Sequence, residues 1–365
     1  MAVDWSRGDI SHRLSVFMLD PSSLSVRGQA KGVVASGELS LDYYSDTRAS
    51  ADISIIAKVG DQPWDGTAAM RLVRTTYDYT GILDESPLGT FFVKPDENAV
   101  SWSDYGDMRT WTFQLVSILY GIKAQVLTRP LVLGKGAKAL STVKSRFKSP
   151  IGRTPSVDGN AKDYSFSSAV EYDAGTSELS VLMDILDKAG DRLSVNELGT
   201  PTVKRYTAPS KLGATFTVDS ADPRTLLVGP VDGGVARQAV PERVIVSSTG
   251  TYKDEQKTFY ADAKAKSGHW STRAVRGYTL DDYRNVSDME PFTQAQAQKL
   301  ANQYLKEQQD NIEESLTHSL LYRPLKDGDV EKLTHGGETR RWLISSADLD
   351  LSSWVWRLQL KGGWS

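Results

Sequence analysis

The stretch His12-Arg13-Leu14-Ser15-Val16-Phe17-Met18-Leu19 decides the fold class of this chain. Apolar residues stand at every second position in it, and the same alternation returns in Gly37–Arg48 and Ala51–Ile56. The alternating positions are Leu14, Val16, Met18, Leu39, Leu41, Tyr43, Ile53, Ile55 and Ala57. Such a strand keeps one face on a core and turns the other toward solvent or a partner. Because the first 120 residues carry no nucleophile motif, metal cluster or phosphate loop, they predict a structural part without catalytic chemistry.

Two further strands are predicted at Met70–Tyr79 and Gly89–Lys94. The turn-forming residues of Gly81–Pro87 are expected to separate them. Trp111–Leu127 is long and apolar, and its pattern fits one strand followed by either a helical or an extended passage. The first third of the chain is therefore expected to be a β-domain.

The middle of the chain changes to helical spacing. This spacing appears at Leu140, Val143 and Phe147, and again at Leu179, Leu182, Met183, Leu186 and Ala189. The first helix should open at Gly134 and stop before Pro150. The second should be capped by Thr176 or Ser177 and end at Gly190. Two short strands follow, at Arg192–Asn196 and Thr202–Tyr206. The pattern predicts a helix packed on a hairpin.

The last third returns to strands around one helix. Thr293 and Gln296 form a capping box for that helix. Its apolar stripe is Ala297, Leu300, Ala301, Tyr304 and Leu305. The predicted strands are Arg243–Ser248 with an edge partner at Tyr252–Tyr260, then Glu314–Leu321, Asp329–Leu333, Arg341–Leu351 and Trp354–Lys361. Asp327-Gly328 and Gly336-Gly337 are expected to form tight hairpin turns.

Composition is that of an ordinary folded protein. The chain has 365 residues, enough for two to four domains, with 24% charged residues, 39% hydrophobic residues and a net charge of −3. A face devoted to a polyanion is not expected from that charge. The absence of cysteine excludes disulfides, thiolate metal sites and cysteine nucleophiles. No apolar run approaches the roughly 20 residues that span a bilayer, so no stable membrane insertion is expected.

Several motifs follow one another in a recognisable order. They are Leu19-Asp20-Pro21, Val26-Arg27-Gly28, Gly37-Glu38-Leu39 leading into Asp42-Tyr43-Tyr44-Ser45-Asp46-Thr47-Arg48, Leu88-Gly89-Thr90-Phe91-Phe92-Val93, and Trp111-Thr112-Phe113-Gln114-Leu115. In this order the chain resembles the minor tail proteins of long-tailed bacteriophages, and specifically the central hub of the tail tip or baseplate. The similarity extends over nearly the full chain, through the helix start near Gly134, the helix and hairpin after Ser177, and the closing strands.

The resemblance implies a β-rich α+β fold with two similar β-barrel tube domains in each subunit. Three subunits would then form a ring of approximate sixfold symmetry. Residues 1–130 would be the first tube domain, 131–235 an inserted peripheral α+β domain, and 236–365 the second tube domain with one long helix. The inserted domain would lie outside the ring.

The function implied is that of a virion hub that adapts a sixfold tail tube to a threefold tip and closes or guides the DNA channel. Its expected partners are two further copies, the distal tail protein ring, the tail tube, the tape-measure protein and receptor-binding or fibre proteins. DNA would pass without specific binding. The protein would be assembled in the host cytoplasm and remain in the virion, with no cofactor, metal or catalytic residue.

Other chemical interpretations of the sequence are weaker. Gly134-Lys135-Gly136, followed by Lys138, Lys144, Arg146 and Lys148, suggests phosphate capture at a helix start but lacks the Walker spacing. Asp327-Gly328-Asp329 and Asp348-Leu349-Asp350 offer too few oxygens for calcium. His335-Gly336-Gly337-Glu338 fits a turn better than a zinc site. The four histidines, His12, His269, His318 and His335, are scattered, and no Gly-x-Ser-x-Gly elbow accompanies them.

The tryptophans support the main alternative, a carbohydrate-binding receptor module. Four of the nine, Trp342, Trp354, Trp356 and Trp364, cluster near the C-terminus. Trp354 and Trp356 would share one strand face by period two, and core or interface packing is the favoured interpretation. Exposed coplanar indoles would favour sugar binding instead. A tail-associated cell-wall hydrolase is a third hypothesis, which would require a convergent acid/base pair or triad.

Overall fold

A computed structural model describes Trp5 and residues 9–66, 69–151, 153–161, 163–235, 240–252, 255–269, 271–285, 294–310 and 314–364. The chain divides into two compact units. The first comprises Met1–Val231, Thr317–Leu360 and Ser365, and the second comprises Asp232–Leu316 and Lys361–Trp364. No helix in the described part of the chain has the length and apolar character needed to cross a membrane.

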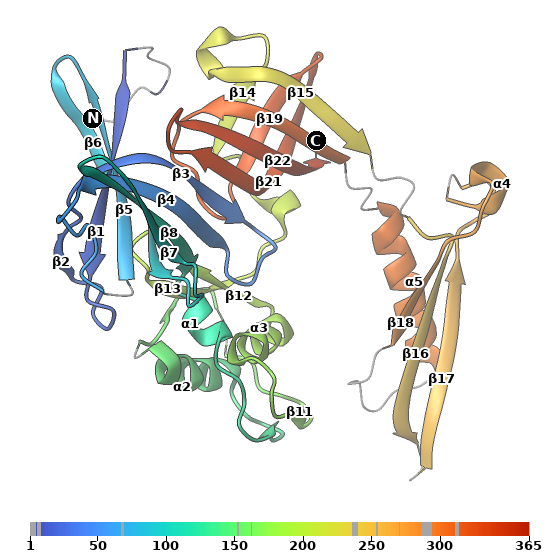
Figure 1. The fold of residues 1–365 in the computed structure, drawn as a ribbon. Coiled ribbons are helices and arrows are strands. Elements are labelled where there is room, and N and C mark those ends of the chain that lie inside the picture. Colours follow the sequence, from blue (N-terminus) through green and yellow to red (C-terminus); the bar gives the residue numbers. More distant parts are fainter. Residues whose placement is uncertain are drawn as a thin grey trace. The chain divides into compact units, whose positions relative to one another are not determined.

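A large, mostly antiparallel sheet forms the framework of the first unit (Figure 1). Its 14 strands follow the order β15-β19-β22-β21-β3-β4-β8-β6-β5-β1-β2, with β7 on β8, and with β20 joining β14 to β21. The first eight strands are β1 (Ser11–Leu19), β2 (Val26–Gln29), β3 (Val33–Asp42), β4 (Ala49–Lys58), β5 (Ala69–Asp78), β6 (Gly81–Val93), β7 (Val100–Tyr105) and β8 (Met108–Ser117). The later strands are β14 (Phe216–Asp219), β15 (Leu227–Val235), β19 (Glu314–Leu321), β20 (Val330–His335), β21 (Glu338–Asp350) and β22 (Val355–Trp364).

This topology confirms the β-rich α+β class, with 50% of residues in strands and 15% in helices. The described residues form no closed barrel, because the sheet order ends at β2 and β15 without a pairing between them. Strands from the two expected tube domains instead share the sheet where β21 pairs with β3, from Ser346↔Asp42 to Asp350↔Glu38. The boundaries between the two compact units differ from the boundaries expected for the domains. The domain boundaries remain a proposal.

The alternating pattern produces the expected burial. Leu14 and Val16 of β1 are buried, as are Leu39 of β3 and Ile53 and Ile55 of β4. The strand predictions for the first and third segments are therefore confirmed, whereas Gly37–Arg48 is strand only as far as Asp42 and continues as a loop to Arg48.

The turn predicted over Gly81–Pro87 is wrong, because this segment is the first half of β6 and pairs with β5. The register shifts between Leu72 and Val73, where Pro87 faces Val73. A bulge is one of the few places in a sheet that accept proline. The turn-forming residues therefore mark irregular pairing within one strand.

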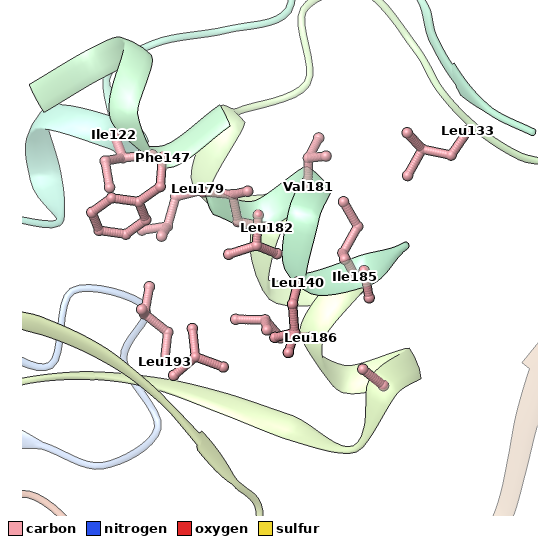
Figure 2. Close-up of a cluster of buried hydrophobic side chains, with 14 of the residues drawn as sticks. Ile122, Leu133, Leu140, Phe147, Leu179, Val181, Leu182, Ile185, Leu186 and Leu193 are labelled. Atoms are coloured by element: carbon pink, nitrogen blue, oxygen red, sulfur yellow. The ribbon is translucent and has the colours of Figure 1, made fainter. Parts of the chain in front are cut away.

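A compact layer of helices packs around a hairpin in the middle of the chain (Figure 1). Its elements are α1 (Tyr120–Lys123), β9 (Leu131–Leu133), α2 (Ala139–Ile151), β10 (Ser156–Val157), β11 (Val170–Tyr172), α3 (Glu178–Ala189), β12 (Asp191–Val195) and β13 (Pro201–Arg205). Figure 2 shows their shared core, which includes Leu140 and Phe147 of α2, Leu182 and Leu186 of α3, and Leu193 of β12. The predicted helix on a hairpin is confirmed.

Local details of this layer differ from the prediction. Gly190 ends α3 with a left-handed φ of 71°, as expected. Ser177 occupies the N-cap position, but its hydroxyl donates to the carbonyl of Lys123 and makes no cap hydrogen bond. The pattern left the second half of Trp111–Leu127 undecided between helix and extended chain. The segment contains most of β8, which ends at Ser117, and then the short helix α1.

The second unit holds a three-stranded sheet with a helix on one face. The sheet order is β17-β16-β18, and the elements are β16 (Arg243–Tyr252), β17 (Glu255–Lys264), α4 (Arg273–Arg276), β18 (Asp281–Asn285) and α5 (Gln294–Asp310). Val244 and Val246 pack with Ala297 and Ala301 of α5. The expected capping residue Thr293 lies outside the described residues. The partner strand predicted from Tyr252 begins at Glu255, because Tyr252 is the last residue of β16 and pairs with it.

Two predictions about the C-terminal strands need correction. Gly336 and Gly337 do form the hairpin turn between β20 and β21, where His335 pairs with Glu338. Asp327-Gly328 forms a turn but no hairpin, because β19 pairs with β15 and β22 whereas β20 pairs with β14 and β21. Trp354 lies in the turn before β22 with a positive φ of 56°, so period two does not place it on a face with Trp356.

Candidate functional site

The central strands carry an open polar face on the side away from the core. Antiparallel residues that lie directly opposite share a face of the sheet. Two cross-strand rows lie on this face. One runs across β21, β3, β4 and β8 through Asp348, Ser40, Ser50 and Val116. The other runs across β4, β8 and β7 through Ser54, Thr112 and Ser101. Hydroxyl and carboxylate side chains therefore cover most of β3, β4 and their neighbours.

Three carboxylates lie side by side in one row of this face. Asp350 of β21 pairs with Glu38 of β3, Glu38 pairs with Asp52 of β4, and Asp52 faces Gln114. The amides of Ser352 and Ser353 donate to Asp350 and hold its pKa below the ordinary value. No group of residues that could hold a metal ion is found in the described part of the chain. We call Glu38, Asp52 and Asp350 the acidic row.

The acidic row opposes the stability of the sheet. Like charges directly opposite one another in a sheet are destabilising. The same strands bury Leu39, Ile53 and Phe113 on their other face. Their apolar face therefore holds the fold together. On the acidic face, Asp350 caps the turn before β22 through the amides of Ser352 and Ser353, whereas Glu38 and Asp52 are exposed on the sheet.

The motif Asp42–Arg48 ends β3 at Asp42 and then forms the loop to β4, which meets the helical layer. Asp42 shapes this loop by accepting hydrogen bonds from the amides of Tyr44 and Ser45. The guanidinium of Arg192 lies 3.4 Å from the centre of the Tyr43 ring. It also donates to both carboxylate oxygens of Asp327, at 3.2 Å each. This Arg192 joint therefore links the sheet, β12 and the loop before β20.

The electrostatics of the Arg192 joint follow from its burial. Burial raises the pKa of Asp327, while the nearby Arg192 and Arg48 oppose that rise. Burial and the repulsion of Arg192 lower the pKa of Arg48, whose φ is also positive at 65°. Two hollows of about 200 and 540 Å3 adjoin the joint, and Asp327 lines both. The polar joint is partly buried and is built mainly by charge pairing.

A buried arginine lies at the centre of an aromatic cluster in the same unit. Arg74 is fully buried, and its guanidinium lies 4.7 Å from the Trp5 ring and 4.6 Å from the Tyr322 ring. It donates to Asp84 and to Ser86. Such cation–π contacts strengthen when the cation is desolvated.

His12 belongs to this aromatic cluster. Its ring centre lies 5.0 Å from that of Tyr322 and 4.9 Å from that of Trp354. Burial and the charge of Arg74 lower the pKa of His12 to about 4. Burial raises the pKa of Tyr322 to about 12. The cluster therefore favours a neutral imidazole and a neutral phenol.

The C-terminal tryptophans do not form an exposed platform. Trp342 is 4% exposed and Trp356 is 1% exposed, and the Trp356 indole donates to the carbonyl of Arg323. Trp354 is half-buried against Tyr322, and Trp364 is half-buried at the end of β22. Among the tryptophans that the structure describes, the exposed one is Trp102, at 55% exposure. The sequence reasoning missed it because Val100–Tyr105 was not among the predicted strands.

The other candidate motifs lie apart from one another and have structural partners. Asp163 accepts a hydrogen bond from the amide of Leu140 at the start of α2. Arg146 pairs with Glu178. The four histidines have separate partners, with His12 on Thr76, His269 on Ser271, His318 on Glu331 and His335 on Ser220.

Comparison with solved structures identifies proteins of the same fold. A tail protein from Neisseria meningitidis matches with a TM-score of 0.65 at 13% identity, over 96% of both chains. The 43 kDa tail protein of prophage MuSo2 from Shewanella oneidensis matches with a TM-score of 0.61 at 10% identity, over 95% of this chain and 97% of that one. The chain has the fold of these tail proteins. The resemblance to phage tail proteins that the motif order indicated is thereby confirmed, whereas the two closed barrels and the trimeric ring that it implied are not.

Two further results complete the comparison. VgrG–PdpA complex structures from Francisella contain a similar chain, with a TM-score of 0.54 at 8% identity, over 97% of this chain and 58% of that one. No protein-family model and no curated protein sequence matches the chain. At these identities the likeness concerns the fold alone.

Proposed function

We propose that this chain is a structural component of a phage tail and forms the hub of the tail tip or baseplate. The observation that supports this best is the match to the Neisseria tail protein along 96% of both chains. A match of that extent takes in residues of both compact units. Such a hub acts through its surfaces and needs no catalytic residue.

The acidic row gives this proposal a physical basis. A hub that guides DNA must present a surface to which the phosphate backbone does not adhere. Carboxylates and hydroxyls on the open face of β3, β4 and β21 meet that need. We therefore assign this face to the wall of the channel. This role would offset the repulsion that Glu38 experiences opposite Asp52 and Asp350.

The assembly proposed is a trimer. Three chains that each contribute two sheet regions would present six similar surfaces to a sixfold tail tube. The expected domains 1–130 and 236–365 would supply these regions, and residues 131–235 would lie at the periphery. Distal tail, tail tube, tape-measure and fibre proteins are the proposed neighbours.

The mass of the assembly tests this proposal. Native mass spectrometry of tail tips that contain the chain should give three copies, with the isolated protein either trimeric or monomeric. Six copies per virion would contradict the hub and favour a distal tail ring. A zymogram of the purified chain should show no cell-wall clearing. Clearing that is lost when one aspartate or glutamate is replaced would instead establish a hydrolase.

The carbohydrate-binding alternative has lost its main support. It depended on exposed C-terminal indoles, whereas Trp342 and Trp356 are buried. We therefore do not propose it as a second function.

A further inference from the structure

Strand β7 is an edge strand with an unusual combination of features. Within the described residues it pairs with β8 alone. It contains neither lysine nor proline, the residues that commonly protect sheet edges from pairing with another chain. Trp102 is 55% exposed and Tyr105 is 90% exposed. The edge is therefore open both in its backbone and in its side chains.

The hydrogen-bond pattern shows which backbone groups of β7 point away from the sheet. The amide of Gln114 donates to the carbonyl of Ala99, one residue before the strand. Hydrogen-bonded and non-hydrogen-bonded pairs alternate along an antiparallel ladder. Because Val100 faces Phe113, the pairs at Val100, Trp102 and Asp104 are non-hydrogen-bonded. The N–H and C=O groups of these three residues therefore point to the open edge.

The side chains beside this edge form a stacked ladder. The guanidinium of Arg109 lies 3.9 Å from the centre of the Trp102 ring and 5.7 Å from the centre of the Trp111 ring. Asp104 accepts two hydrogen bonds from Arg109, at 2.6 and 2.9 Å, and neutralises it. Among the described residues, the ring or guanidinium found against Trp102 is that of Arg109 alone.

We propose that β7 is a docking edge for an extended segment of a different tail polypeptide, which adds as a strand and packs an apolar or aromatic side chain against Trp102. Three outward residues supply paired donors and acceptors at strand spacing, which a polypeptide backbone satisfies. The neutralised Asp104–Arg109 pair favours an uncharged segment. Tryptophan, tyrosine and arginine are also the residue types that dominate binding at protein interfaces.

This inference rests on the proposed function because it places the partner in the tail. Photocross-linking in assembled tails tests it. The exposed Ser101 would be replaced by p-benzoylphenylalanine, and cross-linked peptides would be identified by mass spectrometry. We expect one short segment of a different tail protein.

Two variants at one position separate backbone pairing from side-chain effects. Asp104→Pro removes an outward N–H, whereas Asp104→Ala removes the same carboxylate and keeps that N–H. Cross-linking should fall at least tenfold in the first and persist in the second. Ser103→Lys, which adds a charge beside the edge without removing a backbone donor, should also reduce cross-linking if Asp104→Pro fails to fold.

The remaining outcomes contradict the inference in distinguishable ways. If the chain is in tails but yields no cross-link, or cross-links only to a second copy of itself, the docking edge is refuted and the proposed function stands. Quenching of Trp102 fluorescence in the purified chain by chitohexaose, lost in Trp102→Ala, would show a sugar platform instead. Absence of the chain from tails would refute both the function and this inference.

Discussion

Strands β3, β4 and β8 have two faces of opposite character. One face buries Leu39, Ile53 and Phe113, and the other exposes Glu38 and Asp52 in a row of like charges. Hydrophobic burial stabilises the fold in proportion to the apolar area removed from water, whereas a row of carboxylates opposes it. The difference indicates that stability is concentrated on one face and that the other is available for function.

The largest expected effect comes from the buried side. Trp356→Ala removes a side chain that is 1% exposed together with its hydrogen bond to the carbonyl of Arg323. We expect a loss of about 3–5 kcal/mol in the free energy of unfolding and failure to enter virions. Arg357→Ala, next to it on the exposed side of β22, is the matched control. Chemical denaturation measures both, and an unchanged midpoint for Trp356→Ala would contradict the assignment of this face to the core.

A smaller loss is expected at the Arg192 joint. Arg192→Ala leaves the partly buried carboxylate of Asp327 without its ion-pair partner, and we expect a cost of about 1–3 kcal/mol. The double variant with Asp327→Ala should lose less than the sum of the two single variants. Arg224→Ala breaks an exposed ion pair and should leave the melting temperature unchanged. Additive losses at Arg192 and Asp327 would show that the joint is not a coupled unit.

The aromatic cluster around Arg74 predicts a dependence on pH. The folded-state pKa of His12 is about 4, below its ordinary value of 6.5, so folding favours the neutral ring. The contribution of His12 to the free energy of unfolding is fully present above about pH 6.5 and is lost as the pH falls toward 4. The melting temperature should therefore drop less between pH 7 and pH 5 in His12→Gln than in the parent. His335→Gln, at an exposed hairpin turn, should retain the parent's drop, and equal drops in all three proteins would refute the role of His12.

The smallest effect is expected on the acidic face. Glu38→Gln removes the central charge of the acidic row and should stabilise the protein by ~0.2–1 kcal/mol at low salt. The gain should shrink as ionic strength rises, because salt screens exposed charges. Glu97→Gln, in an exposed turn, should have no such effect. Destabilisation by Glu38→Gln would mean that this face contributes to the fold.

The sequence predicted the elements whose signal is local. Alternation located β1, β3 and β4, and helical spacing located α3. Features that depend on pairing between distant segments were not predictable. Glu38 and Asp350 become neighbours only through the register of β21 on β3, and Trp354 leaves the strand pattern because its backbone turns before β22.

The Arg192 joint shows the same limit. The Asp42–Arg48 motif is one of the motifs whose order carries the resemblance, but nothing in its sequence indicates a partner in β12 or before β20. Arg192 and Asp327 lie 135 residues apart and meet only after the sheet and the helical layer have packed. The edge of β7 was missed for another reason, because a short strand of serine, aspartate and aromatic residues gives only a weak period of two.

The acidic face is proposed to line a channel in a tail. A cryo-EM map of tails that contain this chain tests it most directly. We expect three copies around the axis at the tip, with Glu38, Asp52 and Asp350 facing the channel. A map in which this face points to the exterior of the particle, or is buried against another protein, would contradict it.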